Sequence, residues 1–586
     1  MVASPFASQP DNSAVLFDRD RQQWYRFQQP RHLLSATRLA DVLPVLEEVS
    51  QRVTAEQLYG VGFVTYEAAP AFDPILVVQS GNSEELPFPL VWFGLYAAPT
   101  PLTLPPFQPV DVAWTPQLSA VDYQAAIRKT KDYIKAGVTY QVNYSFRLQA
   151  SLASDPWHLF LQMVQAQGKG YGAFVQTPDW AICSASPELF FERTDQTLVS
   201  RPMKGTVSRG RWYGEDRQRA EWLHHSEKNR AENVMIVDMV RNDMAQIAET
   251  GTVDVPRLFD LEQYPTLWQM TSTVQCRTKA SIPAIFRALF PAASITGAPK
   301  ARTMKIIAEL EASPRRIYTG SIGLMRPDGR SQFNVAIRTV LVDRQRQRAE
   351  YGVGGGILWD SQEQAELEEC QTKARVLTQV KPTFSLLETM AWSPETGYFL
   401  LEKHLQRLRQ SAGYFGFPIS ISTIHQRLEI LALQLARQPH RVRLLLSEDG
   451  GIWLEHTPHT ETLEPLRVAL APSPVDSSDP FLYHKTTHRQ VYEQARSHHP
   501  DQDDVLLWNE RGELTEACLG NIVVEQDSEF YTPPIDCGLL AGTYRAFLLE
   551  QGKLRERVVL VQDLHQYSGI YVINSVRKMQ QARIST

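Results

Sequence analysis

The sequence predicts two mixed α+β domains in succession. Its 586 residues, 43% of them hydrophobic, are more than one ordinary core needs. Helical and strand-like hydrophobic spacings alternate along the chain, which is typical of mixed folds. A polar segment with a proline, residues 378–383, separates two such patterns. We therefore expect domains over residues 1–378 and 384–586.

Composition excludes several classes of protein. The net charge of −6 gives no basic surplus for nucleic acid, and no apolar run reaches the roughly 20 residues of a membrane span. Residues 1–6 lack the cationic start of an export signal. The five cysteines are scattered, without a close pair. These features predict a cytoplasmic protein that binds neither nucleic acid nor membrane.

A helix is expected over residues 124–137, followed by a strand over residues 138–144. Farther along, Lys204 follows the strand-like residues 198–200, so its amine should emerge at a strand end. Most lysines are exposed. In a partly apolar cleft, however, a lysine amine loses its charge more easily and becomes a nucleophile or a base.

Carboxylates mark three further positions. Glu188 precedes an apolar strand, where burial would raise its pKa and make it an acid. On a helix over residues 227–243, Glu232 shares the apolar face that we expect to point inward. Glu366 and Glu369 share a face of a helix over residues 364–374 and could hold Mg²⁺ with Glu232. Alternatively, Glu369 pairs with the lysine four residues on.

Three segments could bind an anionic substrate. Residues 294–300 offer backbone N–H groups, hydroxyls and an amine at a helix start. The glycines of residues 353–357 permit close backbone approach. A strand is expected over residues 333–339, and it would present Arg338 to a carboxylate.

In order, these motifs resemble the chorismate-utilising enzymes over roughly residues 115–377. The motifs are Ser-Pro-Glu-Leu, Pro-Met-Lys-Gly-Thr, Ala-Glu-Asn-Val-Met-Ile-Val-Asp-Met-Val-Arg-Asn-Asp, Ser-Ile-Thr-Gly-Ala-Pro-Lys, Tyr-Thr-Gly-Ser-Ile-Gly and Gly-Gly-Gly-Ile. Residues 62–70 look like the N-terminal part of the family's aminodeoxychorismate synthase component I branch. The resemblance implies a fold of antiparallel sheets flanked by helices.

The resemblance also implies roles for the site residues. Lys204 would attack C2 of chorismate as the C4 hydroxyl leaves, and Glu188 would be the acid and base at that hydroxyl. Glu232 and Glu369 would bind Mg²⁺. The substrate contacts would be Thr296, Tyr318, Arg338, Gly354, Gly355 and Gly356. One departure is Gln269, which stands where many members have a histidine and cannot titrate.

The second domain begins with an expected strand over residues 384–392 and a helix over residues 402–415. Lys485 follows an apolar pair, and Glu516 precedes a small-residue turn. A lysine and an acid are the protein groups that a pyridoxal phosphate enzyme requires.

With residues 404–408, 539–545 and 573–575, this part resembles fold-type IV pyridoxal phosphate enzymes, which include aminodeoxychorismate lyase. The resemblance implies that Lys485 carries the cofactor and moves protons, and that Glu516 contacts the pyridine nitrogen. The phosphate would be held by Arg407, Thr543, Tyr544 and Ser575. The domain looks trimmed at both ends, so it would depend on the first domain or, as a homodimer, on a second copy.

Together, the two resemblances imply an enzyme that makes 4-aminobenzoate for folate. The first domain would aminate chorismate, and the second would release pyruvate. Since the sequence lacks a Gly-x-Cys-x-Gly turn, a separate glutamine amidotransferase subunit would supply the ammonia. The alternatives are an anthranilate synthase-type enzyme with an attached branched-chain-type aminotransferase, or a second domain that serves only for docking.

Overall fold

The computed structural model describes residues 12–79, 88–168, 170–379, 382–435, 437–459 and 464–585. Residues 1–6 and part of the expected interdomain segment, residues 380–381, lie outside them. The chain divides into two compact units. One comprises Met1–Ser208 and Trp222–Lys381, and the other comprises Arg209–Glu221 and Pro382–Thr586. Both contain helices and sheets, which confirms the α+β class.

The first unit contains two large antiparallel sheets. The strands of sheet A, in spatial order, are β16 (Gly297–Ala298), β8 (Gln141–Ser151), β20 (Arg348–Ile357), β19 (Thr339–Asp343), β10 (Trp180–Ser186), β9 (Tyr171–Gln176), β1 (Ser13–Asp18), β2 (Gln23–Phe27) and β6 (Thr100–Leu102), with β7 (Thr115–Pro116) beside β8.

The strands of sheet B follow the same pattern. In spatial order they are β13 (Met203–Ser208), β15 (Leu267–Arg277), β12 (Thr197–Arg201), β11 (Leu189–Thr194), β18 (Ser331–Val335), β17 (Ser321–Met325), β4 (Tyr59–Val64), β5 (Val91–Tyr96) and β3 (His32–Ala36), with β14 (Asp254–Gln263) beside β15.

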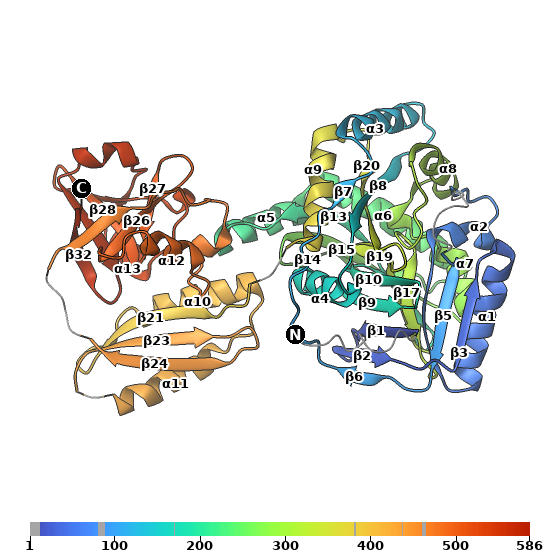
Figure 1. The fold of residues 1–586 in the computed structure, drawn as a ribbon, viewed down its shortest axis with the longest axis horizontal. Helices are drawn as coiled ribbons and strands as arrows, with labels where there is room; N and C mark the ends of the chain where they lie inside the picture. Colours follow the sequence, from blue (N-terminus) through green and yellow to red (C-terminus); the bar gives the residue numbers. More distant parts are fainter. Residues whose placement is uncertain are drawn as a thin grey trace. The chain divides into compact units, whose positions relative to one another are not determined.

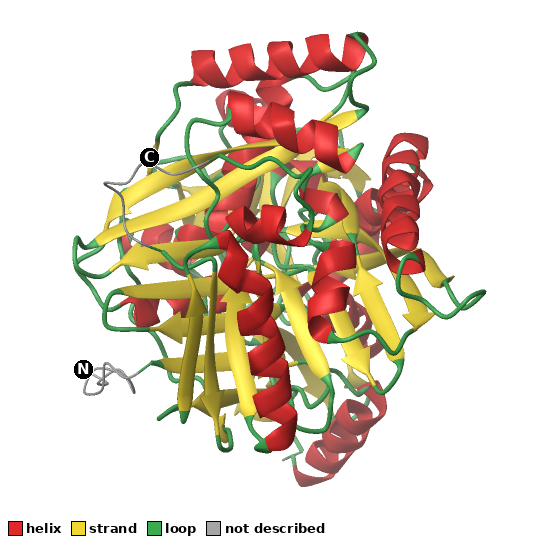
Figure 2. Cartoon of the chain, turned by 90° about the vertical axis from the view of Figure 1, so that its right-hand side faces the viewer, coloured by secondary structure: helices red, strands yellow, loops and turns green. Residues whose placement is uncertain are grey.

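The two sheets pack face to face, because apolar side chains from both form one core cluster. The rings of Phe63 on β4 and Trp180 on β10 meet edge to face across it at 5.3 Å. Helices cover the outer faces (Figure 2). They are α1 (Leu39–Ala55), η1 (Tyr66–Ala68), α2 (Ala69–Phe72), α3 (Ala120–Lys135), α4 (Pro156–Gln167), α6 (Glu227–Ala245), α7 (Ile282–Leu289), η2 (Ala293–Ile295), α8 (Lys300–Leu310), α9 (Glu363–Ala374) and η3 (Arg375–Leu377).

Helix α6 begins where the sequence predicts, because the Ser226 side chain accepts a hydrogen bond from the backbone N–H of Asn229. Its inward face differs from the predicted one. The buried stripe runs through Asn233, Ile236 and Val240, so Glu232 lies at the edge of this stripe and is half-buried.

The strand predicted over residues 333–339 is wrong as a single strand. β18 ends at Val335, and β19 begins at Thr339 in the other sheet. Between them Arg338 adopts a φ of 50°, a left-handed conformation that breaks the strand. The chain changes sheets at this point, so Arg338 projects from a bend.

The second unit has its own antiparallel sheet and a mixed sheet (Figure 1). The former has the order β22 (Gly397–Tyr398), β21 (Leu386–Ser393), β23 (His440–Leu446) and β24 (Ile452–Pro458). The latter has the order β27 (Leu514–Ala517), β26 (Asp504–Trp508), β25 (Leu466–Leu470), β32 (Lys578–Ile584), β31 (Gly569–Asn574), β28 (Gly520–Gln526), β29 (Glu529–Thr532) and β30 (Arg555–Glu556).

The helices of this unit are α10 (Leu401–Phe415), α11 (Ile421–Gln434), η4 (Pro480–Leu482), α12 (Gln490–Ser497), η5 (Ile535–Cys537), α13 (Thr543–Glu550) and η6 (Val561–Gln566). Helix α10 ends as predicted, because Gly416 takes up a left-handed φ of 77° after it. Helix α5 (Tyr213–His225) begins within the segment Arg209–Glu221 that belongs to this unit.

Candidate active sites

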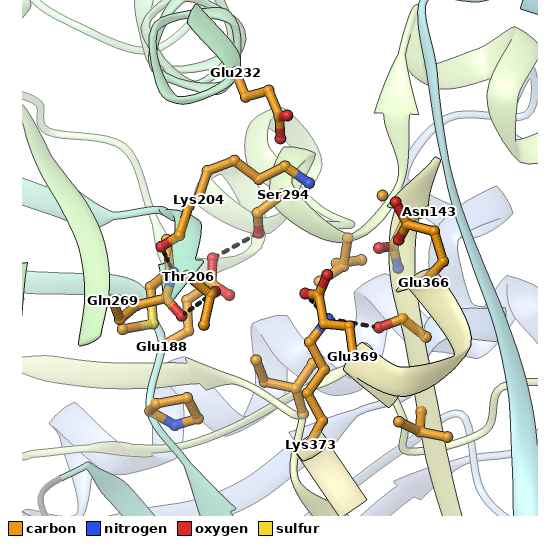
Figure 3. Close-up of a pocket in the computed structure, with 18 of the residues that line it drawn as sticks. Asn143, Glu188, Lys204, Thr206, Glu232, Gln269, Ser294, Glu366, Glu369 and Lys373 are labelled. Carbon is orange, nitrogen blue, oxygen red and sulfur yellow. Dashed lines mark hydrogen bonds and ion pairs between the residues drawn. The ribbon is translucent and has the colours of Figure 1, made fainter. Parts of the chain in front are cut away.

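A cavity of about 320 Å³ lies in the first unit. Side chains far apart in the sequence line it, and the labelled ones converge in Figure 3. The lining residues that bear on chemistry are Asn143, Glu188, Lys204, Glu232, Ser294, Tyr318, Arg338, Gly354, Gly356, Glu366, Glu369 and Lys373. The cavity therefore gathers most of the residues that the sequence singles out.

Lys204 extends into this cavity from strand β13 (Figure 3). Its backbone is held from α6, since the Asn233 side chain donates to the Lys204 carbonyl at 3.3 Å. The Gln269 amide donates to the next carbonyl, that of Gly205, at 2.8 Å. A methyl group added at Gly356 would meet the Lys204 amine at 2.3 Å. Because Gly356 has no side chain, it leaves room for the Lys204 amine.

Glu188 is the most deeply buried acid of the cavity, with 3% of its surface exposed. Burial raises the pKa of its carboxyl to about 7, although a hydrogen bond from Ser294 and the charge of Lys204 act in the opposite direction. The Ser294 hydroxyl donates to Glu188 Oε1 at 2.6 Å. Near neutral pH this carboxyl can therefore give or take a proton.

The cavity is also lined by a cationic side chain, that of Arg338, which could bind an anionic substrate. Arg338 is half-buried, and burial lowers the pKa of its guanidinium. It donates to the Gln167 side chain, but in the part of the chain that the structure describes no carboxylate pairs with it. Because a buried charge needs a partner, the site favours a substrate carboxylate.

Three glutamates approach the amine of Lys204 from α6 and α9 (Figure 3). Burial raises the pKa of Glu232 and of Glu366, whereas Lys373 lowers the pKa of Glu369. Glu369 forms an ion pair with Lys373 at 2.8 Å, which is the alternative to a metal ligand that the sequence predicts. Within the described residues, no three acidic, histidine or cysteine side chains gather closely enough to hold a metal ion. The glutamates are hard oxygen donors, and burial disfavours the charge of Glu232 and Glu366, so they nonetheless suit a divalent cation.

Two predicted substrate contacts lie beside the cavity. Thr296 is fully buried, and its hydroxyl donates to the carbonyls of Ala292 and Ala293. The hydroxyl that lines the cavity in this segment is that of Ser294. Gly355 faces Glu366, whose Oε2 would lie 3.1 Å from an added methyl group. Lys300 pairs with Asp243 at 2.8 Å and lies outside the lining.

The sequence analysis missed two residues at this cavity. The Lys373 amine donates to the Gly354 carbonyl at 2.9 Å and lines the wall. Gln141 is fully buried, and its amide has no hydrogen-bond partner among the described residues. Its nitrogen would lie 2.4 Å from a methyl group at Gly356. The polar alternation of Gln141 and Asn143 on a buried strand was the available signal.

Lys485 follows η4 in the second unit, and its carbonyl accepts from the backbone N–H of Leu387 on β21 at 2.9 Å. Burial, followed by the charge of Arg407, lowers the pKa of its amine to about 8. Glu516 is 4% exposed, and burial raises the pKa of its carboxyl to about 7. The charges of Lys485 and Glu516 act on each other's pKa, so the structure brings the two together.

Two of the four predicted phosphate ligands, Arg407 and Thr543, belong to one cluster around Glu388. Arg407 forms a two-pronged pair with buried Glu388, whose pKa falls to about 2 against the effect of burial. The Thr543 hydroxyl is 3.2 Å from His404 Nε2, and His404 also contacts Glu388, at 2.6 Å.

Of the other two, Ser575 donates to the Thr389 carbonyl on β21. The Tyr544 ring packs against Phe399 and Phe547 in a small apolar cluster. A lysine with a depressed pKa beside a buried acid fits pyridoxal phosphate, whose pyridinium charge would stabilise Glu516 as an anion.

Comparison with known proteins identifies the family. Residues 11–379 match the family model for chorismate binding enzyme, and residues 385–584 match that for class IV amino-transferases. The chain therefore belongs to the chorismate binding enzymes.

Curated relatives carry two different names. Aminodeoxychorismate synthase component 1 of Salmonella typhimurium is 39% identical over 280 residues, which cover 47% of this chain and 60% of the relative. Anthranilate synthase component 1 of Haloarcula marismortui is 35% identical over 275 residues, covering 47% and 56%. The chain thus spans about 60% of the length of these relatives.

A solved structure shares the fold of the first unit. The menaquinone-specific isochorismate synthase of Escherichia coli aligns with a TM-score of 0.52 at 18% identity, covering 64% of this chain and 90% of that one. The described part of the chain contains no helix with the length and apolar character needed to cross a membrane.

Proposed function

We propose that this chain converts chorismate and ammonia to 4-amino-4-deoxychorismate in its first unit and releases pyruvate from that compound in its second, yielding 4-aminobenzoate for folate. One observation carries the first step: the amine of Lys204 shares a cavity with the buried acid Glu188 and with Arg338, which has no carboxylate partner among the residues that the structure describes. The names of the aminodeoxychorismate synthase relatives support the same substrate.

In the first half-reaction, the neutral amine of Lys204 forms a bond to C2 of the chorismate ring. The two conjugated double bonds of the ring shift, from C1=C2 and C5=C6 to C1=C6 and C4=C5, and the C4–O bond breaks, while Glu188 gives its proton so that the hydroxyl leaves as water. Arg338 would hold a carboxylate of the substrate.

In the second half-reaction, ammonia forms the C4–N bond, and the bond from C2 to Lys204 breaks. Glu188, now a carboxylate, takes the proton that ammonia loses. The lysine leaves as the free amine and is ready for another turnover. Ammonia would come from a glutamine amidotransferase subunit, as the component 1 relatives suggest.

Glu232 and Glu369, with Glu366 beside them, would hold Mg²⁺. The ion would neutralise the charge of the ring carboxylate and stabilise these glutamates as anions. Lys373, already paired with Glu369, limits how much negative charge collects in the cavity before substrate enters.

In the second unit, pyridoxal phosphate would supply an electron sink for the release of pyruvate. Lys485 would carry the cofactor and move protons, and Glu516 would hold the pyridine nitrogen. Arg407, Thr543, Tyr544 and Ser575 would hold the phosphate. The contacts of Arg407 with Glu388, of Thr543 with His404 and of Ser575 with β21 support this assignment.

The test is to incubate the protein with chorismate and an ammonium salt and to identify the products by mass spectrometry. We expect 4-amino-4-deoxychorismate, followed by 4-aminobenzoate and pyruvate when pyridoxal phosphate is present. Anthranilate would contradict the proposal and favour the alternative enzyme. A protein that takes up no cofactor but still aminates chorismate would favour a docking role for the second unit.

A further inference from the structure

The second unit contains a segment from far upstream in the sequence, Arg209–Glu221. It follows β13, the strand of Lys204, and it precedes α6, the helix of Glu232. The sequence gives no hint of this, because the expected boundary lies some 160 residues later, near residue 378. A functional role for this segment requires specific contacts with the rest of the second unit.

Its first anchor is a buried ion pair. Arg209 and Asp216 have side chains that are 6% and 2% exposed, and Arg209 Nε lies 2.6 Å from Asp216 Oδ1. The same guanidinium donates to the Tyr414 carbonyl at 2.7 Å and lies 4.3 Å from the centre of its ring. The Tyr414 hydroxyl in turn donates to the Gly210 carbonyl at 2.8 Å.

The second anchor holds the two residues that precede Lys485. Trp212 packs on the ring of Tyr483 at 5.2 Å, and Arg211 donates to the Tyr483 hydroxyl at 3.2 Å. The ring of His484 lies 4.3 Å from that of Tyr414. His484 is 4% exposed, and burial, followed by the charge of Arg209, lowers the pKa of its ring to about 3.

On its other side, the lysine is bound to β21, where Leu387 donates to its carbonyl. The stretch Tyr483 to Lys485 is therefore held between β21 and the segment Arg209–Glu221. A lysine that carries a cofactor must present it in one geometry, and a displacement of about 1 Å can cost a hundredfold in rate.

We propose that the segment Arg209–Glu221 is a positioning element of the pyridoxal phosphate site: through Tyr414, Tyr483 and His484 it fixes the backbone that presents Lys485. Arg209 is the central positioning residue, because the same guanidinium forms the ion pair with Asp216 and contacts the carbonyl and the ring of Tyr414. The inference rests on the proposed function of Lys485.

The test uses the full chain with Arg209→Ala and, as a matched control, Arg217→Ala, which removes an exposed arginine of the same segment. Hydrogen exchange at Leu387, whose N–H donates to the Lys485 carbonyl, needs no cofactor. We expect exchange at this position to be about tenfold faster in Arg209→Ala than in the unmodified protein, and unchanged in Arg217→Ala. Unchanged exchange would overturn the inference.

A second readout is the affinity for pyridoxal phosphate, titrated by the visible absorbance of the bound cofactor. A loosened Lys485 backbone should weaken cofactor binding about tenfold in Arg209→Ala. An affinity equal to that of the control would contradict a positioning role.

Should Arg209→Ala fail to fold because Asp216 loses its partner, Tyr414→Phe replaces it. This variant removes only the hydroxyl that bonds to Gly210 and should move both readouts in the same direction by a smaller amount. No movement would refute the inference. If the unmodified protein takes up no pyridoxal phosphate, the proposed function of this unit fails, while the exchange measurement still decides whether the segment fixes Lys485.

Discussion

The two units use a lysine in opposite ways. Lys204 projects from a strand into a cavity of about 320 Å³, lined by four glutamates, an arginine and two further lysines. Lys485 lies in a stretch that is fixed on both sides, by β21 and by the rings around His484. The Lys204 side chain thus extends into open space, whereas the backbone that carries Lys485 is held from two sides.

This difference follows from the chemistry proposed for each. A nucleophile that bonds to the substrate ring and then leaves must change place in every turnover, so its surroundings stay open and its wall is made of glycine. A lysine that carries a cofactor must keep one geometry, so rigid neighbours enclose it. The environment, rather than the residue type, separates the two roles.

The largest effect should come from exchanging each lysine for alanine. Lys204→Ala should lower amination of chorismate at least about ten-thousandfold and leave pyruvate release from added 4-amino-4-deoxychorismate intact. Lys485→Ala should do the reverse. Both rates are measured in each variant, with exposed Lys305→Ala as control. An intact amination rate in Lys204→Ala would show that this lysine is not the covalent catalyst.

Glu188→Gln should cost the first reaction about a thousandfold, because the general acid is lost. The pH profile gives a sharper reading. Since burial raises the pKa of Glu188 to about 7, the fraction of protonated acid falls as pH rises through 7. Amination should therefore decline above that pH if release of the C4 hydroxyl limits the rate, and the glutamine variant should lack this limb. A variant that keeps the limb would assign it to another group.

Glu232→Gln should lower amination about a hundredfold and raise the Mg²⁺ concentration needed for half-maximal rate, because one ligand loses its charge. Pyruvate release should not change. Exposed Glu227→Gln on the same helix is the control. Equal Mg²⁺ dependence in both variants would remove Glu232 from the ligand set.

Gly356→Ala probes the space around the nucleophile. The new methyl group would meet the amine of Lys204 at 2.3 Å and the amide of Gln141 at 2.4 Å. Both are side-chain ends that can shift, so the protein should fold while amination falls by roughly tens of fold. Pyruvate release in the same variant serves as the internal control. Full amination activity would mean that Lys204 works from another position.

Much of the fold was predictable because local signals agree with it. The helix expected over residues 227–243 forms as α6 from Glu227 to Ala245, with a serine cap at its start. The acidic helix forms as α9, and α10 ends at its glycine. Amphipathic spacing and caps act within one turn of chain, so the sequence shows them directly.

The errors arise where distant segments decide the structure. The bend at Arg338 exists because the chain changes sheets there, and no spacing of residues reveals that. Gln141 lies beside Gly356 of the cavity wall only because β8 pairs with β20. The segment Arg209–Glu221 belongs to the second unit although it lies far upstream in the sequence. Pairings of this kind depend on the whole fold.

The smallest effect concerns Gln269, the position at which the sequence is expected to depart from the family's pattern. Its amide donates to the Gly205 carbonyl, and its oxygen accepts from the Thr206 hydroxyl, so it braces the strand of Lys204. Gln269→His keeps one of these bonds and should slow amination about two- to fivefold. The product should stay 4-amino-4-deoxychorismate, since Lys204 still directs the nucleophile to C4. Anthranilate from this variant would mean that the histidine, and not the lysine, separates the two reactions.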